Sequence, residues 1–354
     1  MERASQQDFD GPHFGDSGRH SAHWTVPHKI MQWPCIYRHL DCKRPAFTPD
    51  LQAICQEGTR WFVEQTRSTE QSTSALSELL SISKITSESP RPTPSLYSQL
   101  PQLGATPIQR YIESYFRTFN TLRPILDQAV FVRETQPQAL QRGNSGGKEL
   151  DSVLLLLVIA LGQVAYEGII GPPVATSEQG VSGFRGGCTL LSPGKEAFDE
   201  ALRRWPSISS LPTLERVQAL LLQATYHESS ARHWDFWKCA ASASASCESL
   251  IKQRNTDWAS HEGEMLKRAY WACVLDEGYY HHDLDLPLTG IFDFQDEVPL
   301  PAFVHGMEDV GGGAGDVDYS VSFLQFLATI SLKRIVDHIH DTVHKSKYRI
   351  PHDC

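Results

Sequence analysis

The stretch HDLDLPLTGIFDFQDEVPLP (residues 282–301) decides the fold, together with GEMLKRAYWACVLDEGYY (residues 263–280) just before it. The earlier segment contains no proline and is typical of a helix. The residue before Pro287 avoids the helical region, and Gly290 permits a tight turn, so the helix must end there. Residues 298–301 contain two prolines and are extended for the same reason. The sequence therefore predicts a helix followed by an extended, irregular segment.

Polar and apolar residues alternate in blocks along this predicted helix. Glu264 and Arg268 are four residues apart, so they can pair across one helical turn. Lys267 and Trp271 share a neighbouring face, and we expect this polar side to stay in water. The residues expected to pack inward are Ala272, Leu275 and Tyr279.

A helix with Arg268 and Trp271, a Leu-Asp-Leu-Pro-Leu turn and a Val-Pro-Leu-Pro segment resembles the core of the fungal transcription factor regulatory domain. The resemblance covers residues 107–301 in the expected order of elements. It implies an all-α, multi-helix regulatory domain. It also implies a structural role for eight motif residues: Trp271, Leu284, Asp285, Leu286, Pro287, Gly290, Pro299 and Pro301.

The segments upstream also carry helical patterns. Aromatic residues recur at helical spacing from residue 107, and an apolar helix at residues 154–161 and a helix at residues 195–205 follow. The sequence LERVQALLLQATYHE is amphipathic, and Ser210 or Thr213 could cap its first turn. The residues expected to dock the opening aromatic helix are Tyr115, Phe116, Pro124, Ile125 and Phe131.

Composition divides the chain into three regions. Residues 1–30 are rich in Gly, Ser, His and Asp and are predicted to be disordered. Residues 31–106 hold short helical pieces and a Ser/Thr/Pro-rich linker. Residues 107–354 form the predicted helical domain, which is shorter at both ends than the family pattern. Its last predicted helix, residues 320–344, has a stripe that we expect in the core: Leu332, Ile335, Val336, Ile339 and Val343.

Charge argues against autonomous DNA binding. The net charge of -10 and the pI near 5.8 oppose contact with phosphates, because that affinity comes mainly from Lys and Arg. The apolar run at residues 153–161 is too short to span a membrane, which needs roughly 20 apolar residues, and indicates a buried core helix. The N-terminal segment has no apolar core of a secretory signal, so a cytosolic or nuclear location is expected, and the resemblance implies the nucleus.

No metal or cofactor site is predicted. The eight cysteines contain no Cys-x-x-Cys pair, which the binuclear zinc cluster of the family requires. Cys35, Cys42 and Cys55 make a poor zinc site, because three ligands lack a closely spaced pair. His340 and His344 lie one turn apart, but a third ligand and a general base are missing. The Gly-rich segments at residues 143–148 and 311–315 lack the phosphate-binding spacing, and no Gly-x-Ser-x-Gly nucleophile motif occurs.

The resemblance implies a regulator of transcription in a fungus that is not an enzyme, with metabolic and secondary-metabolite pathways as candidate targets. Because the zinc cluster is missing, the expected partner is a DNA-bound transcription factor or the transcription machinery, and dimerisation is an open alternative. Two further classes remain at this point. One is a non-DNA-binding protein that titrates partners or is degenerate, and the other is an enzyme without a recognisable motif.

Overall fold

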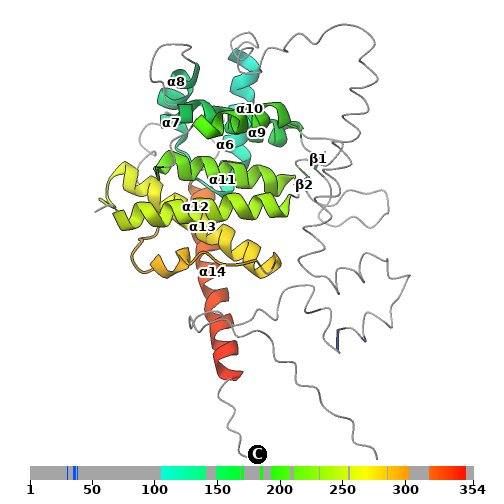
Figure 1. Cartoon of the computed structure of the whole chain (residues 1–354), viewed down its shortest axis with the longest axis vertical. Helices are drawn as coiled ribbons and strands as arrows, with labels where there is room; N and C mark the ends of the chain where they lie inside the picture. Colours follow the sequence, from blue (N-terminus) through cyan, green and yellow to red (C-terminus); the bar gives the residue numbers. More distant parts are fainter. Residues whose placement is uncertain are drawn as a thin grey trace, which may run out of the picture.

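The computed structural model describes residues 105–140, 149–167, 169–170, 184–185, 193–207, 211–230, 232–253, 256–284, 286–302 and 319–347, and residues 30, 35–36 and 38. Most of these residues are helical. The others form turns, irregular segments and one antiparallel pair of two-residue strands, β1 (Ile169–Ile170) and β2 (Phe184–Arg185). The predicted all-α fold is confirmed (Figure 1). The predicted disordered N-terminus and most of the predicted linker lie outside the described residues, so the division into domains stays a prediction.

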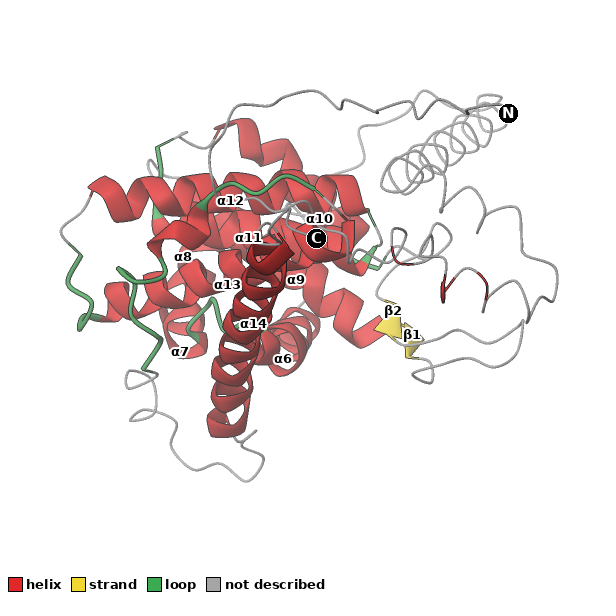
Figure 2. Ribbon diagram, turned by 90° about the horizontal axis from the view of Figure 1, so that it is seen from below, coloured by secondary structure: helices red, strands yellow, loops and turns green. Residues whose placement is uncertain are grey.

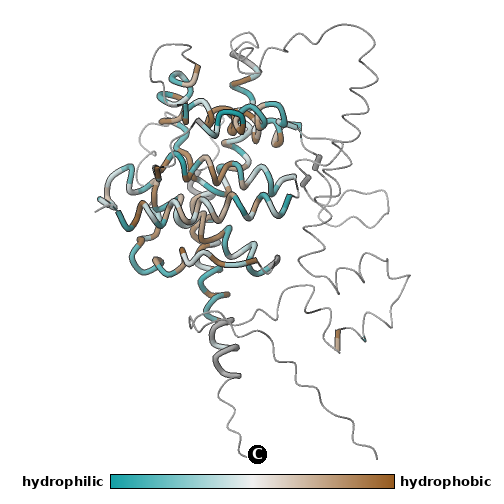
Figure 3. The backbone as a smooth tube through the Cα atoms, viewed as in Figure 1, coloured by the Kyte–Doolittle hydropathy of each residue, from teal (hydrophilic) through white to brown (hydrophobic). Residues whose placement is uncertain are grey.

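Helix α9 (Glu149–Glu167) forms the centre of the bundle. Its apolar stretch from Val153 to Leu161 is buried throughout, and Figure 3 shows apolar segments on the helices in the middle of the bundle. Among the described helices α9 alone is long and apolar enough to cross a membrane, yet 72% of that window is buried inside the bundle. This helix is therefore a core helix, as the sequence predicted. The helices packed against it are α6 (Ala105–Leu122), α8 (Gln136–Leu140), α10 (Lys195–Arg204) and α11 (Leu214–Ser229).

One glycine fixes the approach of α6 to α9. A Cβ placed on Gly162 would lie 2.0 Å from the carbonyl oxygen of Tyr111. No side chain fits at that distance from backbone, so the two helices can approach this closely only with glycine at position 162.

The turn after α6 is built as predicted. α7 (Gln128–Val130) and the π-helical η1 (Phe131–Thr135) follow, and Asp127 caps α7 by accepting a hydrogen bond from the amide of Val130 at 3.0 Å. The five residues expected to dock this region are all buried: Tyr115, Phe116, Pro124, Ile125 and Phe131. These packing predictions are confirmed.

A second set of helices covers α11. Thr213 caps α11 by accepting a hydrogen bond from the amide of Arg216 at 3.2 Å, one of the two caps predicted. α12 (His233–Gln253) packs along α11, and its buried residues include the small Ala240, Ala243 and Ser244. α13 (His261–Leu284) packs against both α11 and α12. Two short 3-10 turns, η2 (Trp205–Ser207) and η3 (Ile291–Phe294), complete this part of the fold.

Three predictions about exposure were wrong, and two of them concern α13. The polar side of α13 was expected in water, but Glu264, Lys267 and Arg268 are only 2%, 5% and 3% exposed, because the segment after α13 folds back over them. Tyr279, expected inside, is 39% exposed.

The third error concerns α14 (Tyr319–Lys347). Its stripe was expected in the core, yet Leu332, Ile335 and Ile339 are exposed and Val336 is half-buried, while the side chain of Val343 lies outside the described part. α14 rests on α6 and α13 through its opposite face, and its C-terminal half extends beyond the bundle (Figures 1 and 2). The spacing of these apolar residues correctly predicted a helix, but they lie mainly on the face of α14 that points away from the bundle.

Candidate functional site

The motif residues gather where residues 286–302, here called the strap, lie across α13. Trp271 is buried, and its Nε1 donates a hydrogen bond to the carbonyl of Pro299 at 3.0 Å. The hydroxyl of Tyr270 donates to the carbonyl of Ile291 at 3.2 Å. Two adjacent aromatic side chains on α13 thus donate hydrogen bonds to two backbone carbonyls of the strap, a segment that forms no strand pairing of its own.

Glu264 anchors the far end of the strap. Its Oε2 accepts a hydrogen bond from the amide of Ala302 at 3.1 Å and lies 2.7 Å from Nζ of Lys267. Its Oε1 accepts from Nε of Arg268 at 3.1 Å, so the predicted pairing of Glu264 with Arg268 is confirmed. Arg268 also stacks over the ring of Phe323 on α14, with its guanidinium carbon 5.5 Å from the ring centroid. The buried charges are therefore paired, which their burial requires.

Glu277 holds the turn at the start of the strap. It accepts hydrogen bonds from the backbone amide of Thr289 and, at 2.7 Å, from the hydroxyl of Thr289. Tyr280 donates to the same carboxylate at 3.2 Å. Gly290 follows with φ of 97°, a left-handed conformation that favours glycine.

The remaining motif residues lie along the same strap. The carbonyl of Leu286 is 2.9 Å from Nδ1 of His281, and the carbonyl of Pro287 accepts from Nε1 of Trp237 at 3.4 Å. Leu286 and Pro301 are buried. Leu284 ends α13, its side chain is outside the described part, and Asp285 is outside the described residues.

A partly buried ion network joins the turn after α6 to α11 and α13, next to this site. The guanidinium of Arg123, just after α6, lies 2.7 Å from Oε2 of Glu228 on α11 and 2.9 Å from Oδ1 of Asp276 on α13. Asp276 is completely buried. Burial raises the pKa of Asp276 to about 7; Arg123 opposes this shift and Glu228 adds to it.

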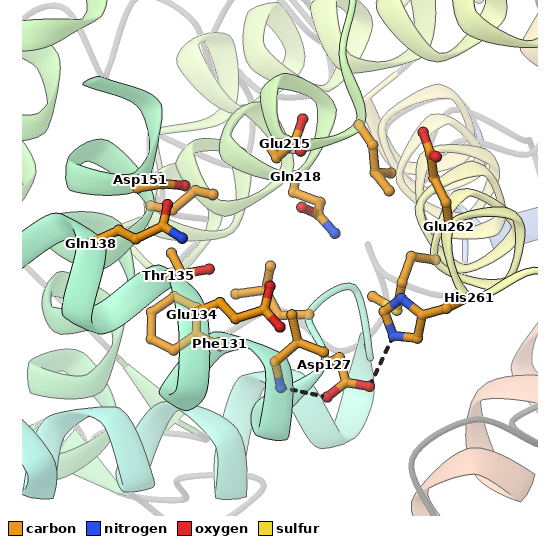
Figure 4. A pocket seen from close by; sticks show the side chains of 15 residues that line it. Asp127, Phe131, Glu134, Thr135, Gln138, Asp151, Glu215, Gln218, His261 and Glu262 are labelled. Atoms are coloured by element: carbon orange, nitrogen blue, oxygen red, sulfur yellow. Dashed lines mark hydrogen bonds and ion pairs between the residues drawn. The ribbon is translucent and has the colours of Figure 1, made fainter. Parts of the chain in front are cut away.

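A half-open cavity of about 320 Å³ lies between η1, α9, α11 and the start of α13 (Figure 4). Its floor is apolar, with Leu126, Phe131 and Met265 among its residues. Carboxylates from five segments line its rim: Asp127, Glu134, Asp151, Glu215 and Glu262. This lining gives a negative potential, which disfavours phosphate and other anions.

One contact ties the two sides of the cavity together. Oδ2 of Asp127 lies 3.2 Å from Nε2 of His261, the first residue of α13 (Figure 4). The same carboxylate caps α7 through its other oxygen. Asp127 therefore links the turn after α6 to the start of the motif helix.

Metal ligation finds no support among the described residues, where no group of three or more His, Cys, Asp or Glu side chains is placed to hold an ion. His338 is exposed, and Asp337 instead pairs with Lys333 and His282. Burial raises the pKa of Cys239 to about 12 and that of Cys273 well above its usual range, so these thiols are neutral and poor ligands. The side chains of His340 and His344, Cys42, Cys55 and both Gly-rich segments lie outside the described residues.

Comparison with known proteins identifies the family. The model of the fungal specific transcription factor domain matches residues 112–350, which is more than half of the chain. The chain therefore belongs to this family, whose regulatory domains are not enzymes. No curated protein and no solved structure matches it.

Two parts of the site were missed from the sequence. Asp276 could have been noticed, since it is an acid within the apolar run of a predicted core helix. Nothing marks Arg123 and Glu228 as its neighbours, or Asp127 as the neighbour of His261, because each contact is made only when distant segments fold together.

Proposed function

We propose that residues 107–354 act as the regulatory domain of a transcription regulator in a fungal nucleus, and that the protein reaches promoters through a DNA-bound transcription factor or the transcription machinery. The observation that carries this proposal is the family match over residues 112–350. Control of a metabolic or secondary-metabolite pathway is the finer form of the proposal.

Charge supports recruitment through a partner. The net charge of -10 opposes contact with phosphates, and the sequence contains no Cys-x-x-Cys pair of the kind that the zinc cluster typical of the family uses. The acidic rim of the cavity has the same sign as the phosphate backbone and adds to this effect. A protein contact is then the route by which this domain influences a promoter.

The motif residues act, in this proposal, as a structural unit. Trp271 and Glu264 hold the strap on α13, and Glu277 fixes its turn through Thr289. These polar groups are occupied by the strap itself. The unit therefore sets the shape of the domain. Its residues influence partner binding by maintaining that shape and do not contact the partner themselves.

The test is chromatin immunoprecipitation of the epitope-tagged protein expressed from its own locus, followed by binding assays with the purified chain on the enriched DNA. We expect enrichment at a discrete set of promoters and no binding to those fragments by the pure protein at physiological salt. Tight, sequence-specific binding by the pure chain would contradict recruitment through a partner.

No enrichment, with the tagged protein intact and abundant in the nucleus, would contradict the regulator proposal. That result would favour a protein that titrates partners away from promoters. Fluorescence imaging of the same strain checks the nuclear location, and a matched strain with the tag on a nuclear protein outside transcription gives the background.

A further inference from the structure

Helix α14 has two faces with different surroundings. Phe326 and Ile330 are completely buried against the bundle. On the same side Lys333 pairs with Asp337, and Asp337 lies 3.3 Å from Nε2 of His282 on α13. This seated face gives α14 its position in the fold, so the helix does not need its other face for that purpose.

The outward face carries large apolar side chains in a continuous line. Their spacing of three or four residues keeps them on one side of the helix, as in the seam of a helix pair. The line, here called the outer stripe, consists of Leu324 (65% exposed), Ala328, Leu332 (61%), Ile335 (56%) and Ile339 (52%). A contiguous exposed apolar line of this kind marks a contact surface rather than the scattered leucines of an ordinary surface.

The described side chains beside the outer stripe carry no negative charge, which suits contact with a second copy of this acidic chain. Among the described side chains of α14 (residues 322–339 and 342) Asp337 is the only acid, and it belongs to the seated face. Thr329, Ser331 and His338 border the stripe. A chain with a net charge of -10 repels its own copies in general, so a face without carboxylates is where two copies can meet.

We propose that the outer stripe is the interface of a homodimer, in which α14 pairs with α14 of a second copy in antiparallel orientation. With the two-fold axis between residues 333 and 334, Leu332 faces Ile335 of the second copy. Ile339 then faces Ala328, so the small side chain leaves room for the large one. The stripe is thus complementary to itself, as a two-fold interface requires.

The position of α14 in the fold makes this pairing accessible. The C-terminal half of α14 extends beyond the bundle, so the stripe on it is reached without moving any of the described helices (Figures 1 and 2). In the antiparallel pair the projecting half of each copy covers the seated half of the other. A pairing in this register therefore covers the whole stripe, and the two bundles lie on opposite sides of the helix pair.

The size of the stripe predicts the strength of the dimer. Its 16 residues span roughly 24 Å of helix. One helix pair of that length buries less than a standard interface of about 1,600 Å² in total, so the dimer should be weak. We expect a dissociation constant in the micromolar range.

The test is sedimentation velocity of the full chain from about 1 µM to about 200 µM, a range that brackets micromolar affinity. We expect a concentration-dependent shift from monomer to dimer. Ile335→Glu places a carboxylate twice at the centre of the interface and should weaken association at least tenfold, a conservative figure of about 1.4 kcal/mol in association free energy. Arg334→Glu adds the same side chain at an exposed position off the stripe and should still dimerise.

Circular dichroism and thermal melting of both variants keep the result interpretable, since both substitutions lie on exposed positions and should leave the fold intact. A wild-type chain that stays monomeric at every concentration overturns the proposal and leaves the stripe to another protein or another segment of this chain. A folded Ile335→Glu variant that dimerises like the wild type overturns it too. Small-angle scattering that shows the two bundles on the same side of the helix pair overturns the antiparallel arrangement.

Discussion

Helices α13 and α14 touch each other and both bury apolar side chains, yet they depart in opposite ways from the rule that charged residues are exposed and apolar ones buried. α13 buries charged side chains, including Glu264 and Asp276, while α14 exposes Leu332 and Ile335. The difference lies in what covers each helix. α13 is covered by α11, α12, α14 and the strap, and the strap supplies hydrogen-bond partners; α14 is covered on one face only by the described elements. Burial therefore follows the neighbours a helix meets, and a charged residue can be inside when every charge has a partner.

The side chains of α13 should determine the stability of the folded chain, and the exposed side chains of α14 should determine its association with a second copy. Removing a buried side chain of α13 leaves a cavity or an unpaired charge, both of which cost several kcal/mol. Removing an exposed side chain of α14 leaves neither. Mutations on the two helices should therefore differ in both size and kind of effect.

The largest effect is expected at Trp271. Trp271→Ala should lower the free energy of unfolding by about 3–5 kcal/mol, because the ring is buried and its Nε1 holds the strap. Urea denaturation at constant pH measures this loss. Trp271→Phe keeps much of the volume and should lose less; a loss below about 1 kcal/mol for the alanine variant would show that the strap does not depend on this residue.

A slightly smaller effect is expected at Glu264. Glu264→Ala leaves Lys267 and Arg268 buried without their carboxylate and should cost about 3 kcal/mol. Asp337→Ala on α14 is the matched control, since Asp337 also pairs with a lysine of its own helix but is more accessible, and its loss should be about 1 kcal/mol. Equal losses in the two variants would remove the distinction between the helices.

The pH dependence of the unfolding free energy tests whether buried ionisable groups in and next to α13 have shifted pKa values. The folded pKa of Asp276 is raised to about 7 by burial, so its unfavourable contribution is relieved as pH falls from 7 toward 4. Burial lowers the folded pKa of His227 to about 4, so the stability it contributes is full above its ordinary pKa near 6.5 and is lost as pH falls toward 4. The two groups act in opposite directions over the same window.

Single variants should separate these two contributions. Asp276→Asn should make the unfolding free energy fall more steeply from pH 7 to pH 4 than in the wild type, and His227→Asn should make it fall less steeply, by on the order of 1 kcal/mol across the window. Urea denaturation at several pH values gives the slopes. Three parallel curves would mean that neither group has the shifted pKa.

The smallest effect is expected on the outer stripe. Leu332→Ala should change the free energy of unfolding of the dilute protein by no more than about 0.5 kcal/mol, because its side chain is mostly exposed. The measurement is made at the lowest workable concentration, so that association does not contribute. A loss above about 2 kcal/mol would show that the stripe is covered within one chain.

The sequence predicted the kind of fold and part of the site, but not the exposure of its faces. Helical spacing located the docking residues Tyr115 and Phe116, and local rules gave the cap at Thr213 and the turn at Gly290. Periodicity defines a face but not its neighbour, so the stripe with Ile335 was placed inside. The charges of α13 were placed in water because the strap covers them only after the chain has folded back. The pairing of Arg123 with Asp276 has the same tertiary origin.

The most direct test of this division between α13 and α14 is hydrogen–deuterium exchange of the native protein at two concentrations, one below and one above the expected dissociation constant. α13 should exchange only with global unfolding at both concentrations, because neighbouring elements bury most of its side chains. The C-terminal half of α14 should exchange early in the dilute protein and become protected in the concentrated one. Equal protection of α14 at both concentrations, or exchange of α13 ahead of α14, would contradict the account.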